Sequence, residues 1–140
     1  MRLTCLAALA SLFACGPALS TAAPDPAATI LLTGSFVPRA HAGSGTASIE
    51  QAQDGGRRLF LADDFATDNG PRLAVYLSKQ PVDAMSGFVD GALRLGPLQG
   101  AKGSQAYPLP DGAELAAFRA VIVWCDDFSV LFTAAPLATP

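Results

Sequence analysis

Residues Val121 to Phe132 read Val-Ile-Val-Trp-Cys-Asp-Asp-Phe-Ser-Val-Leu-Phe, the densest run of β-branched and aromatic residues in the chain. Side chains alternate between the two faces of a strand, and both alternate sets are mostly apolar here. One set is Ile122, Trp124, Phe128, Val130 and Phe132; the other is Val121, Val123, Cys125 and Leu131. A strand that is apolar on both faces is a buried one. This run is therefore predicted to be the central strand of the fold.

The one polar break in this run is Asp126-Asp127. A bulge or a kink at this point would bring both carboxylates to water and spare the cost of burying them unpaired. Cys125 is accordingly expected at a bend, next to charge.

Elsewhere, short apolar runs alternate with turn signals, and no long helical period occurs. The segments 29–33, 46–49, 58–61, 72–78 and 92–98 suit strands, with Asp54-Gly55-Gly56 as a hairpin turn and Pro38 limiting its segment to an edge. Segment 72–78 is predicted to be half-buried, and 114–118 to form one helical turn. We predict an all-β fold, an antiparallel β-sandwich, with a partly open β-barrel as the alternative. The predicted core contains Phe36, Phe65, Val75, Leu77, Trp124, Phe128 and Val130.

The composition of the chain limits the classes of function that can be expected. The chain has 140 residues, of which 51% are hydrophobic and 15% charged, with a formal net charge of -3. This excludes disorder of the whole chain and suits one domain. The longest basic run is Arg57-Arg58, so nucleic acid is not an expected partner. The acidic loop from Asp63 lacks the alternating oxygens of an EF-hand, and no metal site is predicted there.

The N-terminus suggests export. Residues 1–15 carry one positive charge, Arg2, and an apolar stretch too short to span a bilayer, as in a signal peptide. Lipoprotein processing at Cys15 is favoured because Leu12-Phe13-Ala14-Cys15 is similar to a lipobox, although Phe13 departs from it. Ordinary cleavage near residues 20–22 is the alternative. Residues 16–28 are rich in Ala and Pro and are predicted to form a disordered tether. The domain then covers residues 29–140.

The mature region resembles the DM-thirteen domain, a family described as an electron-transfer module. The resemblance runs from Gly34 to Leu137 and includes Gly34-Ser35-Phe36, Val75-Tyr76-Leu77-Ser78 and, as its best anchor, Trp124-Cys125. It implies that Cys125 is the redox residue.

Cys125 also has a plain structural interpretation, since free cysteines are often buried. In an exported domain, however, an unpaired thiol calls for an explanation. Apolar neighbours and two carboxylates disfavour a thiolate, so nucleophilic catalysis fits poorly, whereas ligation or slow one-electron chemistry fits better. His41, the only histidine, is a tentative second ligand, and its alternative is an exposed loop residue. No hydrolase motif is present.

Two functions remain open from the sequence. One is an envelope-anchored redox or electron-transfer accessory that uses Cys125; the other is a non-catalytic binding or adhesion module. Whether the protein is an enzyme is left open, and the cofactor is unknown, with haem or a metal compatible. The expected partners are the membrane, through a lipid on Cys15, and an envelope redox or surface protein. The expected location is the bacterial cell envelope or periplasm.

Overall fold

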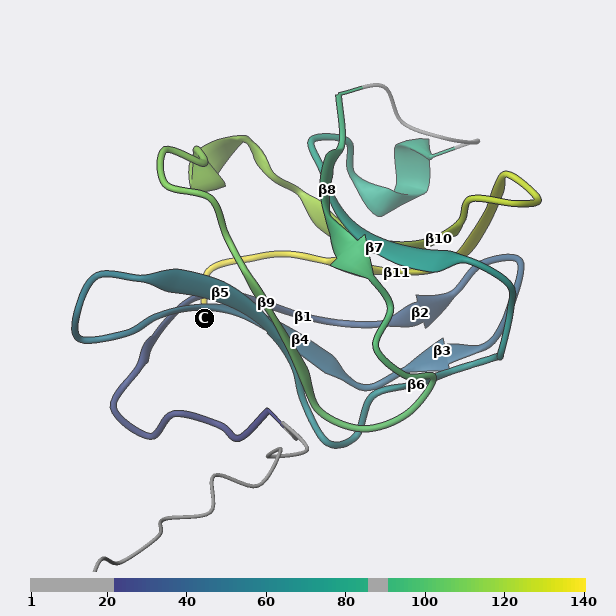
Figure 1. Ribbon diagram of the computed structural model, residues 1–140. Coiled ribbons are helices and arrows are strands. Elements are labelled where there is room, and N and C mark those ends of the chain that lie inside the picture. The colour runs from purple at the N-terminus through teal and green to yellow at the C-terminus, as the bar shows by residue number, and fades with distance from the viewer. Residues whose placement is uncertain (1–21, 86–90) are drawn as a thin grey trace, which may run out of the picture.

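The computed structural model describes residues 22–85 and 91–140. The predicted signal peptide, Cys15 and the first part of the predicted tether lie outside the described residues. Two antiparallel sheets pack face to face, so the β-sandwich prediction is confirmed (Figure 1). In the described part of the chain, no helix is both long and apolar enough to cross a membrane.

One sheet has four strands in the order β1-β4-β5-β9, and the other has five in the order β2-β11-β10-β7-β8; β3 and β6 form a separate pair. The four strands are β1 (Thr29–Ser35), β4 (Thr46–Gln51), β5 (Arg57–Leu61) and β9 (Gln105–Pro108). The five are β2 (Val37–Pro38), β11 (Val130–Pro136), β10 (Ala120–Cys125), β7 (Leu73–Ser78) and β8 (Leu93–Pro97). The pair is β3 (Gly43–Ser44) and β6 (Ala66–Thr67).

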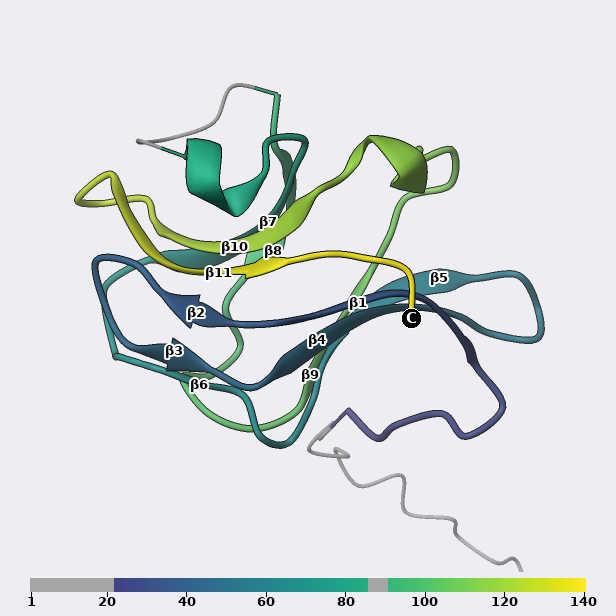
Figure 2. The same ribbon diagram turned by 180° about the vertical axis from the view of Figure 1, so that it is seen from behind.

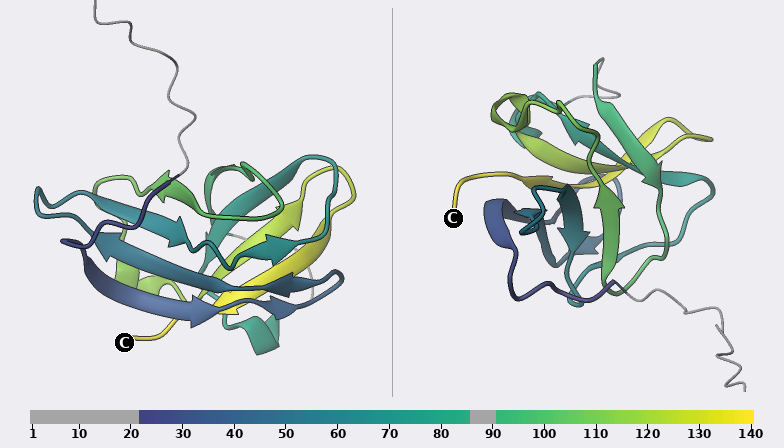
Figure 3. Two further views of the ribbon diagram at one scale, coloured as in Figure 1. Left: turned by 90° about the horizontal axis from the view of Figure 1, so that it is seen from below. Right: turned by 60° about the vertical axis from the view of Figure 1, so that its left-hand side comes forward.

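The two sheets approach each other at the β1 edge. Thr33 and Ala138 exchange backbone hydrogen bonds of 2.8 and 2.9 Å, which link β1 to the chain after β11. Gly34 lies beside the Pro136 carbonyl, and any side chain at Gly34 would collide with that oxygen. The layers therefore touch along this side, as the view from below shows (Figure 3).

The main core fills the space between the sheets, and a second cluster lies on the outer face of the five-stranded sheet. The inner cluster includes Leu73, Val75 and Leu77 from β7 and Val121, Val123 and Cys125 from β10. The outer cluster includes Ala74, Tyr76, Ile122 and Trp124 from the same strands, together with Val82 and Met85. The 3-10 turn η1 (Val82–Ala84) covers this outer face (Figures 1 and 2).

The predicted central strand needs one correction. β10 does lie in the middle of its sheet, but the strand ends at Cys125, and β11 begins at Val130. The residues between them form the turn of a hairpin, with Ser129 at a φ of 53°. Two adjacent carboxylates favour exposure, so the chain reverses where a kink was predicted. The irregularity in the pairing with β11 falls earlier, between Val123 and Trp124.

The hairpin overturns the predicted place of Phe128, whose side chain is 68% exposed because it lies in the turn. The hairpin also changes which face these side chains occupy. Phe132 belongs to the inner cluster and Trp124 to the outer one, although the alternation had placed them on the same face. Val130 is only partly buried against the core. The prediction of a half-buried 72–78 strand was wrong as well, since β7 is buried on both faces once η1 covers the outer one.

Other predictions are confirmed. β4 and β5 form the predicted hairpin, and β2 pairs only with β11 at a sheet edge. The one-turn helix is η2 (Leu115–Ala117), next to the buried Phe118. The core residues Phe36 and Phe65 are 5% and 1% exposed, with ring centroids 5.0 Å apart.

Candidate functional site

Cys125 closes β10 on its inner face. Its side chain is completely buried, and it belongs to the cluster between the two sheets. It is the one cysteine of the described residues and is not in a disulfide. The thiol donates a hydrogen bond to the Pro71 carbonyl, with Sγ and O 3.1 Å apart. The sulfur is therefore enclosed, yet its hydrogen-bond partner is a surface-exposed residue.

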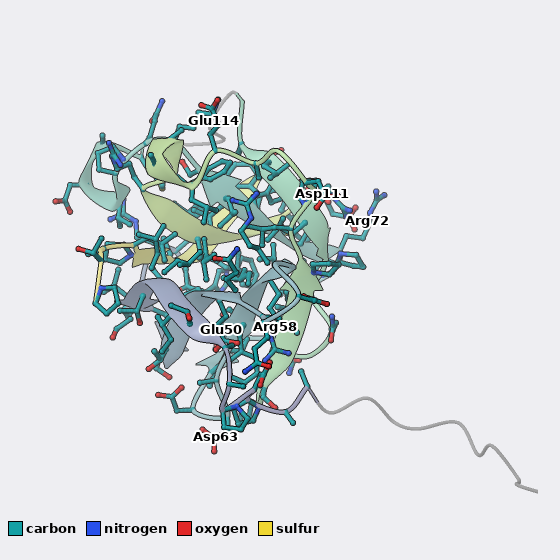
Figure 4. All side chains as sticks on the ribbon, turned by 90° about the vertical axis from the view of Figure 1, so that its left-hand side faces the viewer. Glu50, Arg58, Asp63, Arg72, Asp111 and Glu114 are labelled. Carbon is teal, nitrogen blue, oxygen red and sulfur yellow. The ribbon has the colours of Figure 1, made fainter. Side chains whose placement is uncertain are left out.

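The Pro71-Arg72 turn covers the thiol and is held to the end of β10 by two further contacts. The amide of Asp126 donates to the Arg72 carbonyl at 3.1 Å, and Arg72 Nε lies 3.4 Å from Asp127 Oδ1. Arg72 projects from the surface (Figure 4), and its backbone has a φ of 47°, an unusual value for a residue with a side chain. This turn therefore closes the end of β10 over the sulfur.

A surface hollow flanks this cover. Its volume is about 290 Å³, and residues on both sides of Pro71 line it, namely Gly70, Arg72 and Leu73, facing Pro97 and Leu98. A small docking group could therefore approach within one residue of the sulfur without opening the core.

The two carboxylates predicted beside Cys125 carry partners of their own. Asp126 accepts a hydrogen bond from the Tyr76 hydroxyl at 2.9 Å and lies 3.7 Å from Arg94 Nη2. Asp127 pairs with Arg72. Each carboxylate therefore has an arginine of its own nearby.

His41 lies on the loop between β2 and β3, with its side chain 40% exposed. Its ring stacks on Phe132, with centroids 3.8 Å apart, and its Nδ1 is 3.2 Å from Asp68 Oδ2. His41 and Cys125 thus have separate partners. Within residues 22–85 and 91–140, no three His, Cys, Asp or Glu side chains gather as metal ligands. Joint ligation by His41 and Cys125 stays a prediction.

The sequence did not single out Tyr76 and Arg94 as site residues. Tyr76 is 7% exposed, and burial, followed by the hydrogen bond to Asp126, raises its pKa above the ordinary 10.0. The available signal was the alternation in β7, which sets Tyr76 apart from Leu73, Val75 and Leu77. The pairing of its hydroxyl with a carboxylate 50 residues away depends on the register between β7 and β10.

The family follows from a comparison with family models. The model described as Electron transfer DM13 matches residues 35–137, most of the chain and both sheets of the sandwich. The chain belongs to the DM13 family. This supports a redox or electron-transfer module. A search of the curated proteins found no match, and neither did a search of the solved structures.

Within the DM13 match, the hairpin of β10 and β11 and the Pro71-Arg72 cover are both included. Asp68, Tyr76 and Arg94 also lie inside the matched range. The candidate site is therefore part of the family domain and not of the N-terminal segment.

Proposed function

We propose that this DM13 domain is an accessory module that exchanges single electrons through Cys125, and that a lipid on Cys15 holds it at the bacterial cell envelope. The observation that carries the first part is the enclosed thiol under the Pro71 carbonyl. Thiol–disulfide exchange requires one sulfur to attack another directly, which an enclosed sulfur cannot do. Electron transfer does not require that contact.

The step balances as a one-electron oxidation. Cys125 loses an electron to a one-electron redox partner of the envelope and its proton to water, leaving a thiyl radical; the return step restores the thiol. The Pro71 carbonyl is not a base, so the proton is released to water that enters past the exposed Pro71-Arg72 turn. The hollow beside Pro71 gives the partner a site one residue from the sulfur.

The described donor atoms offer no support for a resident haem or metal. Cys125 is sealed and donates its hydrogen bond, His41 is engaged by Asp68 and Phe132, and no third ligand joins them among the described residues. No step of the proposal passes through such a group. An absorbance spectrum of protein purified from its native host checks this, since a haem or a metal thiolate absorbs where the polypeptide does not.

The test of Cys125 oxidises the purified protein with a photogenerated one-electron oxidant and detects the radical by electron paramagnetic resonance in samples frozen after the flash. Wild type should yield a thiyl radical, and Cys125→Ala should yield none while keeping the native circular dichroism. A thiol reagent should leave native Cys125 unmodified. Rapid labelling of the native thiol, or no thiyl radical, would refute the electron-transfer role.

The alternative, a binding module without redox chemistry, rests on one feature of the surface. Phe128 is 68% exposed at the hairpin tip, and a cleft of about 470 Å³ lies next to it, lined by Arg39, Met85, Val130 and their neighbours. Exposed aromatic residues often anchor protein interfaces. If Phe128→Ala abolishes function in the cell while Cys125→Ala does not, the binding module is the better account.

The anchor is tested by metabolic labelling with a fatty acid. Wild type should be labelled and fractionate with membranes, and Cys15→Ser should not. Cys5→Ser is the matched control because Cys5 lies within the apolar stretch and not at the lipobox-like site. Two or more acyl chains would make the attachment stable. A wild-type protein that is unlabelled would refute the anchor.

A further inference from the structure

Tyr76 and Asp126 form a hydrogen-bonded pair on the outer face of the five-stranded sheet. The phenol is 7% exposed, and its hydroxyl donates to Asp126 Oδ1 at 2.9 Å. The second carboxylate oxygen of Asp126 lies 3.7 Å from Arg94 Nη2, and the Arg94 guanidinium carbon lies 6.0 Å from the centre of the Tyr76 ring. The carboxylate that accepts the phenol hydrogen bond thus has a cation beside it.

The register places this pair beside Trp124. Tyr76 pairs with Ile122 of β10, but its hydroxyl reaches Asp126, four residues further along the chain. The ring must therefore run along β10 past Trp124, which belongs to the same outer cluster. Cys125 follows Trp124 directly and faces the opposite side of the sheet. Three oxidisable side chains, those of Tyr76, Trp124 and Cys125, consequently gather at one end of β10.

A phenol that loses an electron becomes a strong acid, so its oxidation near neutral pH requires a group that takes the proton. A base within about 2.6–3.2 Å can do this directly. Asp126 meets that distance for Tyr76. The other tyrosine, Tyr107, donates instead to the amide oxygen of Gln105 at 2.8 Å, and an amide oxygen is not a useful base. The two tyrosines differ in the one property that decides which can be oxidised.

We propose that Tyr76 is a second redox-active residue of this domain, with Asp126 as its proton acceptor, and that it relays single electrons at the outer face. In the forward step, Tyr76 gives one electron to an oxidised one-electron partner, such as a metal centre, and its hydroxyl proton to Asp126. A neutral tyrosyl radical and a protonated Asp126 remain. The reverse step returns the electron from a one-electron donor and the proton from Asp126. The proposal rests on the electron-transfer function of the domain but not on Cys125.

The experiment oxidises the purified protein with flash-generated tris(bipyridyl)ruthenium(III) and follows the tyrosyl radical by absorbance and electron paramagnetic resonance. Wild type and Tyr107→Phe should form the radical at equal rates, and Tyr76→Phe should not form it. Asp126→Asn, which keeps the size of the side chain and removes the base, should slow radical formation by about 100-fold. Wild type should also show a solvent deuterium isotope effect, which the Asn variant should not share.

Several outcomes would overturn the relay. They are a tyrosyl radical that persists in Tyr76→Phe, a tryptophanyl radical alone, and an Asp126→Asn variant as fast as wild type. If Tyr76→Phe fails to fold, the Tyr107→Phe variant identifies the radical, because Tyr76 is the only tyrosine left in it. A tyrosyl radical in that variant must then lie on Tyr76. Cys125→Ser separates the two proposals: the Tyr76 radical should still form there, even if Cys125 proves to have no redox role.

Discussion

The inner and outer faces of β7 and β10 use the same two strands in different ways. The inner face presents Leu73, Val75, Val121 and Val123 to a complete second sheet, and Cys125 is its only chemically reactive group. The outer face is covered by the short segment around η1 and ends in a polar cluster of Tyr76, Asp126 and Arg94. The inner face is covered by a whole sheet and the outer face by a short segment. The same two strands therefore hold an enclosed thiol on one side and a phenol close to the surface on the other.

The two tyrosines show the same contrast. Tyr107 belongs to the inner cluster and is 3% exposed, with its hydroxyl held by the Gln105 amide. Tyr76 belongs to the outer cluster, with its hydroxyl held by a carboxylate. The surroundings of each hydroxyl, rather than residue type, distinguish a structural tyrosine from a reactive one.

The largest expected effect concerns two phenylalanines that the sequence placed together in the core. Phe65→Ala should cost roughly 3–5 kcal/mol because it empties a site that is 1% exposed and packed against the tilted ring of Phe36. Phe128→Ala should change the free energy of unfolding by less than about 0.5 kcal/mol, because its side chain is 68% exposed. Urea unfolding measures both. Equal costs would contradict the hairpin.

Alkaline pH should weaken the fold through both tyrosines. Burial raises the pKa of Tyr107 from the ordinary 10.0 to about 12, and it also raises that of Tyr76. A raised pKa means that the native state holds the proton more tightly than the unfolded chain. The corresponding stability is therefore complete below pH 10 and is lost as the pH rises through about 12. Denaturant midpoints across this window should fall, and they should fall less in Tyr107→Phe. An unchanged slope in that variant would contradict the inner placement.

Substitutions of Cys125 should have a moderate effect. Cys125→Ala should cost roughly 1–3 kcal/mol through lost packing in a fully buried site. A buried serine hydroxyl without a partner would add about 1–3 kcal/mol, but the Pro71 carbonyl is placed to accept its hydrogen bond. Cys125→Ser should therefore cost about as much as Cys125→Ala. A serine variant that is much less stable would show that Pro71 does not serve as that acceptor.

The smallest effect is expected at Arg72 in the cover. Glycine tolerates positive φ, so Arg72→Gly relieves an unfavourable backbone conformation of about 1 kcal/mol. It also loses an exposed ion pair with Asp127, usually worth less than about 1 kcal/mol. We expect a net gain in stability below about 1 kcal/mol. Arg72→Ala, which loses the ion pair and keeps the unfavourable φ, should be slightly destabilising. The difference between the two in thermal unfolding isolates the backbone contribution.

Much of the fold could be predicted from local patterns. Period-two alternation found β7 and β10, the Asp54-Gly55-Gly56 turn found the hairpin of β4 and β5, and Pro38 marked an edge. Alternation could not reveal that the chain reverses after Cys125, because the residues on both sides are equally apolar. The polar pair Asp126-Asp127 indicated a break in the strand. It could not distinguish a kink from a chain reversal, because both use the same residue types.

By itself, the sequence determined an antiparallel all-β fold, with a sandwich favoured over a partly open barrel, because strand period is a local property. The unpaired thiol and the family resemblance singled out Cys125. Only the tertiary structure decided that the thiol is shielded from solvent. It also decided that Tyr76, and not Tyr107, faces a carboxylate, and that Phe128 lies outside the core. These properties depend on which strands become neighbours and in which register. The pairing of β7 with β10 brings Tyr76 to Asp126 and Pro71 to Cys125 across 50 and 54 residues of chain. No local pattern records such a separation, because the packing free energy of the whole core sets the register.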